Sequence, residues 1–495
     1  MKLSISNLSL KSLYLIEVLA VCLILIANIF YTSTIAGNEH SVIHYAHPAI
    51  SVLALVSVGI LAFLASTGSK KLKLKYFIVL IISLDLLALL FWLYNSKLAP
   101  FADQLNVYTA ALRFNLHDYR DFVKGGYVYE YNQQAGLVVM FSLILHLFKD
   151  YRILEALNVL GVLGLHLGLF RLTKEVFNES AAKLALILSS LFVPIILLTS
   201  YVYGDIPGLC LAVWSMCFTI KYSKEDNVKY IVFASLLLGL AMLFRTNMQI
   251  ILIATILYLL LQRRARRIVA VLIIITSLSF NYAVTAYASA RTGSALNQGV
   301  PASLFVNMGL EESSLGDGWY NGSTLRNYYA VKLDHRAASH LGFELISKRL
   351  ADMGDNPGYA LNFFKSKFLS TWTEPTFESI FFTLPHNQTA SVVQYMQNNR
   401  LLHSLYHGQL NKIYLVYCKG FVLFLLIGAA AYPFRRDKKT LEDVVFIFLP
   451  LLGGMAFHLF WETKSRYIYP YVIMLLPIAA GFWHNIKVTE VRSDK

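Results

Sequence analysis

The sequence predicts an all-α polytopic membrane protein with about 12 transmembrane helices, an interfacial helix in the first external loop and a small external domain. Of its 495 residues, 57% are hydrophobic and 15% are charged, and the mean hydropathy is +0.55. Soluble domains carry roughly 45–50% apolar and about 25% charged residues. Most cations stand in short clusters beside long apolar runs, as in polytopic membrane proteins. The net charge of +14 therefore indicates membrane orientation rather than nucleic-acid binding.

The apolar runs define the expected spans, because crossing a bilayer takes about 20 mostly apolar residues. Twelve runs meet this requirement, and they extend over 12–34, 46–66, 76–95, 152–170, 181–201, 205–222, 229–245, 247–262, 267–288, 412–434, 441–461 and 467–485.

A thirteenth apolar run, 134–148, is short and is expected not to cross. If it does not cross, the basic clusters near residues 70–75, 263–267 and 435–439 all face the cytoplasm. If it crosses, the last two clusters face outward, against the positive-inside rule. The segment 134–148 is therefore expected to lie in or on the outer interface of the membrane.

This topology divides the chain into three parts. Residues 1–288 form an N-terminal transmembrane module whose first external loop, 96–151, is large. Residues 289–411 form an external soluble domain, and residues 412–495 form a C-terminal transmembrane module. The expected location is a plasma membrane crossed many times, with the active site outside. A bacterial host is favoured over an endoplasmic reticulum.

The first external loop begins with an acidic residue beside an amide, Asp103-Gln104, just after the third span. A carboxylate at the membrane–water boundary reaches both a lipid headgroup and a water-borne substrate. A low-dielectric neighbourhood also raises its pKa, which suits a general base. The alternative is an ordinary solvated carboxylate in a loop. Asp85, in the middle of the third span, is expected to brace the helix that delivers Asp103.

A second acid, Asp205, follows Tyr203 and Gly204 in a tight outward turn. An aspartate before an apolar run is a good helix N-cap, and Pro207 is tolerated in a first helical turn. Capping alone accounts for much of this pattern, but a role in a site is compatible with it.

Cations also appear at outward-facing ends of spans, where the positive-inside rule disfavours them. They are Arg245 in the turn after one span, and Lys464 and Arg466 before the last span, next to Tyr467. Arginine matches phosphate oxygens with a planar fork and lysine offers a point charge, so a phosphate-bearing lipid satisfies both. The alternative is an internal ion pair between Glu462 and Arg466.

The external domain carries aromatic and amide side chains that suit sugar rings, and Trp372 is the candidate chosen from them. The same residues could instead form a small hydrophobic core.

This ordered set of features resembles the GT-C membrane glycosyltransferases of the protein O-mannosyltransferase-like branch. The resemblance covers nearly the whole chain in layout. It rests on Asp103 after an early span, the non-crossing segment 134–148, Asp205 in the next outward turn, the Arg466-Tyr467-x-x-Pro470 stretch and the external domain. Two spans precede the one that delivers Asp103, where this group often has one.

The resemblance implies an enzyme that moves a single sugar from a polyprenyl-phosphate carrier to an acceptor hydroxyl, with inversion at the anomeric carbon. Asp103 is then the base, and Asp205 orients the acceptor or positions Asp103. Arg466, with Lys464 or Arg245, holds the donor phosphate. Gln104, Tyr203, Tyr467 and Trp372 are the expected substrate-binding residues.

The expected partners are the polyprenyl-phosphate sugar, the membrane and a glycan, lipid or protein acceptor, without nucleic acid. No residue is assigned as a metal ligand, and no cofactor is assigned. A divalent cation remains an alternative, although Gln104 stands where many relatives carry a second acid. Two other functions stay open. One is a flippase or transporter of lipid-linked sugars, and the other is a polymerase or ligase of surface polysaccharide.

Overall fold

A computed structural model describes residues 5–69, 71–96, 99–262, 266–384, 390–434 and 441–484. In this part of the chain, eight helices are long and apolar enough to cross a membrane, by length and composition. They are α1 (Ile5–Phe30), α2 (Pro48–Ser69), α3 (Leu74–Ser96), α7 (Arg152–Val176), α10 (Asp205–Glu225), α13 (Arg266–Thr292), α21 (Gln409–Ala431) and α22 (Leu441–Phe460). The prediction of an all-α polytopic membrane protein is confirmed.

The other four predicted spans correspond to shorter helices. Two are the apolar helices α11 (Val228–Phe244) and α12 (Gln249–Leu261), the latter preceded by the 3₁₀ turn η2 (Thr246–Met248). The predicted span 181–201 corresponds to two helices, α8 (Glu179–Ser190) and α9 (Val193–Leu198). The predicted span 467–485 likewise corresponds to α23 (Ser465–Ile473) and α24 (Leu476–Trp483). Both second halves carry a proline in their first turn. Proline fits a first turn but cannot continue a preceding helix, so each run breaks there.

The first predicted span, 12–34, extends four residues beyond the end of the helix. Helix α1 stops at Phe30, and the chain enters an antiparallel hairpin of β1 (Tyr31–Ala36) and β2 (His40–Tyr45). Threonine and isoleucine dominate β1, and β-branched residues favour strands. Gly37 adopts a φ of +52° in the turn, which glycine reaches without steric cost.

Several loops that the sequence predicts to be cytoplasmic meet at one end of the helix bundle. Lys183 near the start of α8 donates a hydrogen bond to the carbonyl of Leu72, at 3.2 Å, before α3. Lys224 at the end of α10 lies 3.7 Å from Asp443 at the start of α22. We call this the basic end. The predicted basic residues Lys70, 263–265 and 435–440 lie outside the described residues.

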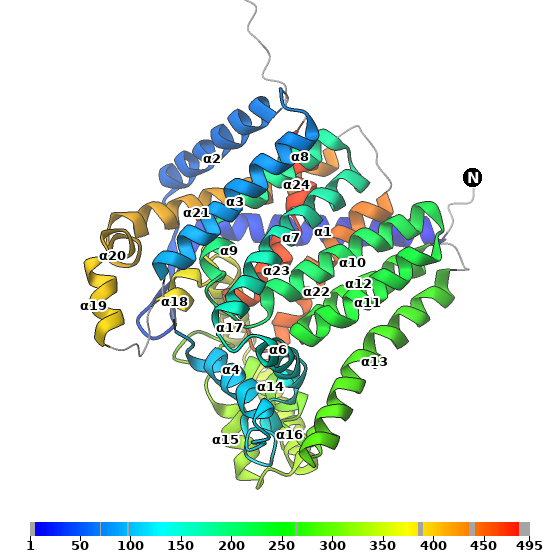
Figure 1. The fold of residues 1–495 in the computed structure, drawn as a ribbon, viewed down its shortest axis with the longest axis vertical. Coiled ribbons are helices and arrows are strands. Elements are labelled where there is room, and N and C mark those ends of the chain that lie inside the picture. Colours follow the sequence, from blue (N-terminus) through cyan, green and yellow to red (C-terminus); the bar gives the residue numbers. More distant parts are fainter. Residues whose placement is uncertain are drawn as a thin grey trace, which may run out of the picture.

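The opposite end receives the segment between α3 and α7. This segment holds α4 (Ala102–Asn115), the short α5 (Tyr127–Glu130) and η1 (Asn132–Gln134), and α6 (Ala135–Leu147). The amide of Gln104 on α4 donates to the Tyr151 hydroxyl just before α7. The chain therefore leaves α3 and enters α7 at the same end, and α6 does not change that direction. In Figure 1, α4 and α6 lie side by side at this end, and α6 also packs against α11 and α13. Its depth in a bilayer stays a prediction.

The described residues of 293–384 and 390–408 form further helices, most of them short, beyond the same end of the bundle (Figure 1). They are η3 (Leu296–Gln298), α14 (Ala302–Gly309), α15 (Ser323–Ala330), α16 (His335–Asp355), α17 (Pro357–Trp372), α18 (Ser379–Thr383), α19 (Ala390–Asn398) and α20 (Arg400–His407). Leu304, Tyr328 and Ala338 are fully buried in a core of their own. The division of the chain at 289 and 411 stays a prediction.

A buried polar contact fixes α3 in the bundle. The Asp85 carboxylate lies 2.8 Å from Nδ1 of His166 on α7 and accepts a hydrogen bond from Ser190 at the end of α8, at 2.9 Å. Both partners lie on neighbouring helices, so the prediction that Asp85 braces the helix leading to Asp103 is confirmed.

Candidate active site

Asp205 joins two arginines that are far apart in the sequence. Its Oδ1 lies 2.9 Å from Nε of Arg245, and its Oδ2 accepts a hydrogen bond of 2.9 Å from Nη1 of Arg466. Asp205 and Arg466 are 7% and 2% exposed. One carboxylate thus neutralises only one of two buried guanidinium groups, and the three side chains keep a net positive charge.

The turn that presents Asp205 depends on a glycine. Gly204 has a φ of +81°, and a Cβ atom there would lie 2.5 Å from the carbonyl oxygen of Phe244. Only glycine accepts both this conformation and this contact. The close approach brings the start of α10 against the end of α11, where Arg245 follows. The close approach of the two backbones at Gly204 and Phe244 therefore places Asp205 next to Arg245.

Arg466 lies over four aromatic rings. Its guanidinium carbon is 4.4 Å from the ring centre of Phe382, 4.9 Å from Tyr201, 5.1 Å from Tyr467 and 5.5 Å from Tyr203. Such contacts are stronger where water is excluded. Within the described part of the chain, Nε of Arg466 has no hydrogen-bond partner. The guanidinium is thus held in position with donor capacity unused.

Asp103 lies beside the same aromatic cluster. Phe101, which precedes α4, is 6.1 Å from Tyr201 and 6.3 Å from Phe382 between ring centres, and both rings lie under Arg466. Asp103 itself is exposed in the first turn of α4. Burial raises the pKa of Tyr201, Arg466 lowers it and Asp103 raises it. One phenol therefore responds to the charges of both Asp103 and Arg466.

Tyr203 connects this cluster to α6. Its hydroxyl accepts a hydrogen bond of 2.8 Å from the Gln134 amide and lies 3.3 Å from the Tyr127 hydroxyl. The Arg245 guanidinium lies 4.7 Å from its ring centre. Burial raises the pKa of Tyr203, and the nearby Asp103 raises it further. Tyr203 is thus a neutral hydrogen-bonding group between the two arginines and Asp103.

Lys464 is paired with an acid that the sequence did not single out. Its Nζ donates a 2.5 Å hydrogen bond to Glu39, in the turn of the β1–β2 hairpin. Burial lowers the pKa of Lys464, but Glu39, Glu378 and Glu462 raise it to about 12. Lys464 is therefore charged, and it already forms an ion pair with Glu39.

Residues between α14 and α18 hold the segment before α23 in place. The Thr463 amide donates to the Gly318 carbonyl at 3.0 Å. The Ser465 hydroxyl contacts Glu374 at 2.9 Å and Glu378 at 3.0 Å. The Arg466 amide donates to Glu378 at 3.3 Å. Arg466 is therefore held in position both by the turn after α17 and by Asp205 at the start of α10.

The turn 373–378 that supplies these acids has an unusual backbone. Phe377 and Glu378 have φ values of +53° and +56°, which are costly for residues with side chains. The Glu374 carboxylate stabilises the turn by accepting hydrogen bonds from the amides of Thr376, at 2.9 Å, and Glu378, at 2.8 Å. Strained conformations of this kind cluster at functional sites.

Lys367 on α17 fastens two helix ends. Its Nζ donates to the carbonyls of Gly309 at 2.5 Å, Trp461 at 2.9 Å and Leu459 at 3.1 Å, which close α14 and α22. It is 3% exposed. Burial lowers its pKa to about 7, against the opposing influence of Glu462 and Asp317.

Replacing Lys367 by methionine should destabilise the protein by about 1–3 kcal/mol, because buried carbonyls lose their donor. Thermal unfolding of the purified protein measures this. The matched control is Lys365→Met, two residues earlier and exposed. Equal midpoints for the two variants would show that Lys367 fastens nothing.

Glu462 should make stability depend on pH. Burial raises its pKa to about 7, Lys464 lowers it, and Asp103 and Glu39 raise it. The folded protein thus favours the protonated acid. The resulting stability is present below pH 4.5, the unfolded value, and is lost as pH rises toward 7.

We expect Glu462→Gln to remove part of this loss, at most about 3 kcal/mol. Unfolding midpoints at pH 5 and pH 8 should differ less in Glu462→Gln than in the wild type. The control is Glu344→Gln, an exposed acid on α16. An unchanged difference in Glu462→Gln would mean that Glu462 does not titrate in this range.

Two of the sequence-predicted residues are buried and contact residues other than Arg466. Gln104 is fully buried and bonds Tyr151. Trp372 is 5% exposed and stacks on Phe368 with ring centres 6.3 Å apart, so its face is covered in this structure. A chain of contacts connects Asp205, Arg245, Tyr203, Arg466 and Tyr467. Asp103 lies beside this group, and Lys464 pairs with Glu39.

Sequence reasoning missed Glu39, Lys367, Glu374, Glu378 and Phe382. The only sequence signal for any of them is the stretch 373–378. It holds two acids, Glu374 and Glu378, close to a proline and to aromatic residues. Within the described residues, no group of three or more histidine, cysteine, aspartate or glutamate side chains could hold a metal ion.

The model of a family described as dolichyl-phosphate-mannose-protein mannosyltransferase matches residues 138–286. This match confirms the resemblance to the O-mannosyltransferase-like branch. It covers under a third of the chain, including Tyr203, Asp205 and Arg245, whereas Asp103 and Arg466 lie outside it. Comparison with curated proteins gives no match.

Among solved structures, the oligosaccharyltransferase of Archaeoglobus fulgidus, tethered with an acceptor peptide, is 11% identical with a TM-score of 0.44. The archaeal oligosaccharyltransferase AglB from the same organism, in complex with an inhibitory peptide and a dolichol-phosphate, is 16% identical with a TM-score of 0.41. These matches cover 82% of this chain, and 49% and 50% of the archaeal chains. This chain thus spans about half their length.

Proposed function

We propose that this chain, part of which matches the dolichyl-phosphate-mannose-protein mannosyltransferase family, is a membrane glycosyltransferase. It moves one sugar from a polyprenyl-phosphate carrier to an acceptor hydroxyl at the outer face of the membrane. The observation that carries the proposal is the buried Asp205–Arg466–Arg245 group beside Asp103, at the end of the bundle opposite the basic loops.

The donor phosphate binds at Arg466. A phosphate is an anion with several acceptor oxygens, and Arg466 carries an unused donor while it shares the carboxylate of Asp205 with Arg245. The aromatic rings around it exclude water, which strengthens the attraction. A polyprenyl chain stays in the bilayer, so the phosphate meets the protein where a span ends, as α23 begins.

Asp103 accepts the proton of the acceptor hydroxyl. The acceptor oxygen forms a bond to the anomeric carbon, and the bond from that carbon to the phosphate oxygen breaks. The electron pair of the broken bond stays on the phosphate, whose charge Arg466 stabilises. A phosphate leaves without protonation, so one base and one cation suffice for the reaction. A single displacement inverts the anomeric centre.

Asp205 is a positioning residue in this proposal. Both of its oxygens are used by Arg245 and Arg466, which leaves it poorly placed to take a proton from the acceptor. Its role is to hold two like charges together near the donor. This differs from the two roles that the resemblance implied for Asp205, which were to orient the acceptor or to position Asp103.

The full-length protein in lipid nanodiscs tests the proposal. It should transfer labelled sugar from polyprenyl-phosphate mannose or polyprenyl-phosphate glucose to envelope glycans extracted from the host. Nuclear magnetic resonance of the product should show an inverted anomer. Movement of the lipid-linked sugar across a bilayer without any transfer would support a flippase instead.

Replacing Arg466 by alanine should weaken donor binding more than tenfold, since charge-assisted hydrogen bonds contribute about 1.5–3 kcal/mol. Binding of polyprenyl phosphate to the purified variant, measured by native mass spectrometry, checks this. Arg291→Ala is the matched control, because Arg291 ends α13 outside the aromatic cluster. Donor affinity equal to the wild type in Arg466→Ala would remove the phosphate assignment.

A further inference from the structure

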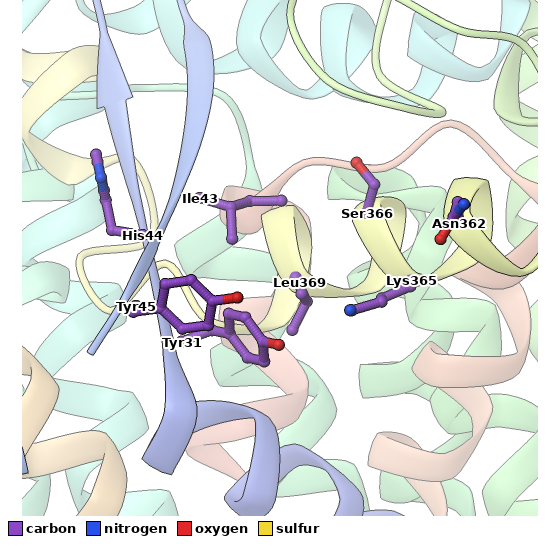
Figure 2. A pocket seen from close by; sticks show the side chains of 8 residues that line it. All are labelled: Tyr31, Ile43, His44, Tyr45, Asn362, Lys365, Ser366 and Leu369. Carbon is purple, nitrogen blue, oxygen red and sulfur yellow. The ribbon is translucent and has the colours of Figure 1, made fainter.

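A second site lies where the β1–β2 hairpin meets α17, apart from the aromatic cluster. A hollow of about 280 Å³ opens there between the strands and the helix. Figure 2 shows its lining, with Tyr31, Ile43, His44 and Tyr45 on the hairpin side and Asn362, Lys365, Ser366 and Leu369 on α17.

The polar lining of this hollow suits an anion. Lys365 is exposed, and its Nζ lies 5.7 Å from the ring centre of Tyr31 (Figure 2). Asn362 and Ser366 stand on the same face of α17, three residues before and one after Lys365. No carboxylate is among the lining residues. A cation with amide and hydroxyl neighbours and no acid attracts a phosphate group.

The aromatic part of the lining is of the kind that membrane proteins place at a membrane boundary. Tyr31 and Tyr45 face each other across the hairpin, with ring centres 5.3 Å apart. Tyr31 directly follows α1, and Tyr45 lies three residues before α2. Tyrosine is enriched at the headgroup level of membrane proteins. Tyr45 is 84% exposed, although a tyrosine normally buries much of its ring.

Below this boundary, α1 and α2 present an open apolar wall. Large apolar side chains near the adjoining ends of both helices are exposed, among them Ile26, Ile29, Phe30, Ile50 and Leu53. A ligand that fits both regions has an anionic head for the hollow and hydrocarbon chains for the wall.

We propose that the hollow between the hairpin and α17 is a headgroup site for an anionic phospholipid. The phosphate contacts Lys365, with Asn362 and Ser366 as further hydrogen-bond donors, and the acyl chains lie along α1 and α2. This assigns a role to the two spans that precede the helix leading to Asp103. The site does not depend on the sugar-transfer chemistry.

Native mass spectrometry of the full-length protein tests this proposal, with phosphatidylglycerol added as the anionic lipid and phosphatidylcholine as the zwitterionic one. We expect the wild type to bind phosphatidylglycerol preferentially. Lys365→Ala should weaken that binding about fivefold, since one lysine near a membrane contributes about 1 kcal/mol. Tyr45→Ala should weaken it as well. Lys348→Ala, an exposed lysine on α16, is the matched control and should bind as the wild type does.

Equal phosphatidylglycerol binding by the wild type and Lys365→Ala would overturn the proposal. So would equal binding of phosphatidylcholine, or displacement of the lipid by millimolar inorganic phosphate, which would point to a soluble anion as the ligand. Sugar transfer is not part of the readout, so failure here is distinct from failure of the proposed function.

Discussion

Replacing Asp103 by asparagine should lower the rate of sugar transfer about 10²–10⁴-fold, the usual contribution of a general base. Asparagine keeps the size of the side chain but cannot take the acceptor proton. Asp103 is exposed and makes no ion pair in the described part of the chain, so the variant should fold normally. Transfer from polyprenyl-phosphate sugar by the purified variant measures the effect, and polyprenyl-phosphate binding should remain as in the wild type.

The matched control for this variant is Asp118→Asn. Asp118 belongs to the same external loop but pairs with Arg120, at 2.9 Å. It should retain wild-type transfer. If Asp103→Asn turned over at the wild-type rate while folding normally, another group would have to be the base.

Replacing Asp205 by asparagine should have the second-largest effect, on stability as well as on transfer. Two buried guanidinium groups then face each other without a counter-charge, and breaking a buried pair costs about 3–5 kcal/mol. The amide NH₂ also points a donor at one of the arginines. We expect a lower unfolding midpoint together with weaker polyprenyl-phosphate binding, because Arg466 loses its support.

Glu225→Gln is the control for Asp205→Asn, because Glu225 is an exposed acid at the far end of the same helix. It should leave both the midpoint and donor binding unchanged. If Asp205→Asn unfolded at the wild-type temperature, Asp205 would not be the counter-charge that holds the two arginines.

The sequence carries enough information for the membrane helices because the hydrophobic signal of a span is long and local. Charge patterning also predicted that the loop 96–151 begins and ends at the same end of the bundle, as the hydrogen bond between Gln104 and Tyr151 shows. The residues at which single helices begin and end were harder to predict from the sequence. The hairpin after Phe30 and the breaks before Pro194 and Pro477 depend on a few residues within otherwise apolar runs.

The candidate site could be predicted only where polar residues interrupt span ends. Asp205, Arg245 and Arg466 stand out there, because charges at such positions need a reason. Their pairing was not accessible: Arg466 was expected to pair with Glu462 or to bind a phosphate, and its hydrogen bond to Asp205 was not foreseen. Glu39 and Lys367 were missed for a related reason. Glu39 bonds Lys464 and Lys367 bonds Trp461, and both partners are far away in the sequence. Only the packing of the hairpin and of α17 brings these residues together.

In the proposed function, Asp103 and Arg466 serve one donor molecule at the end of the bundle opposite the basic loops. A structure of the full-length protein in nanodiscs with polyprenyl phosphate bound tests this claim. We expect the phosphate within hydrogen-bond distance of the Arg466 guanidinium, with the Asp103 carboxylate facing the space where the sugar attaches. A phosphate seated at the basic end, or out of reach of Arg466, would contradict the claim.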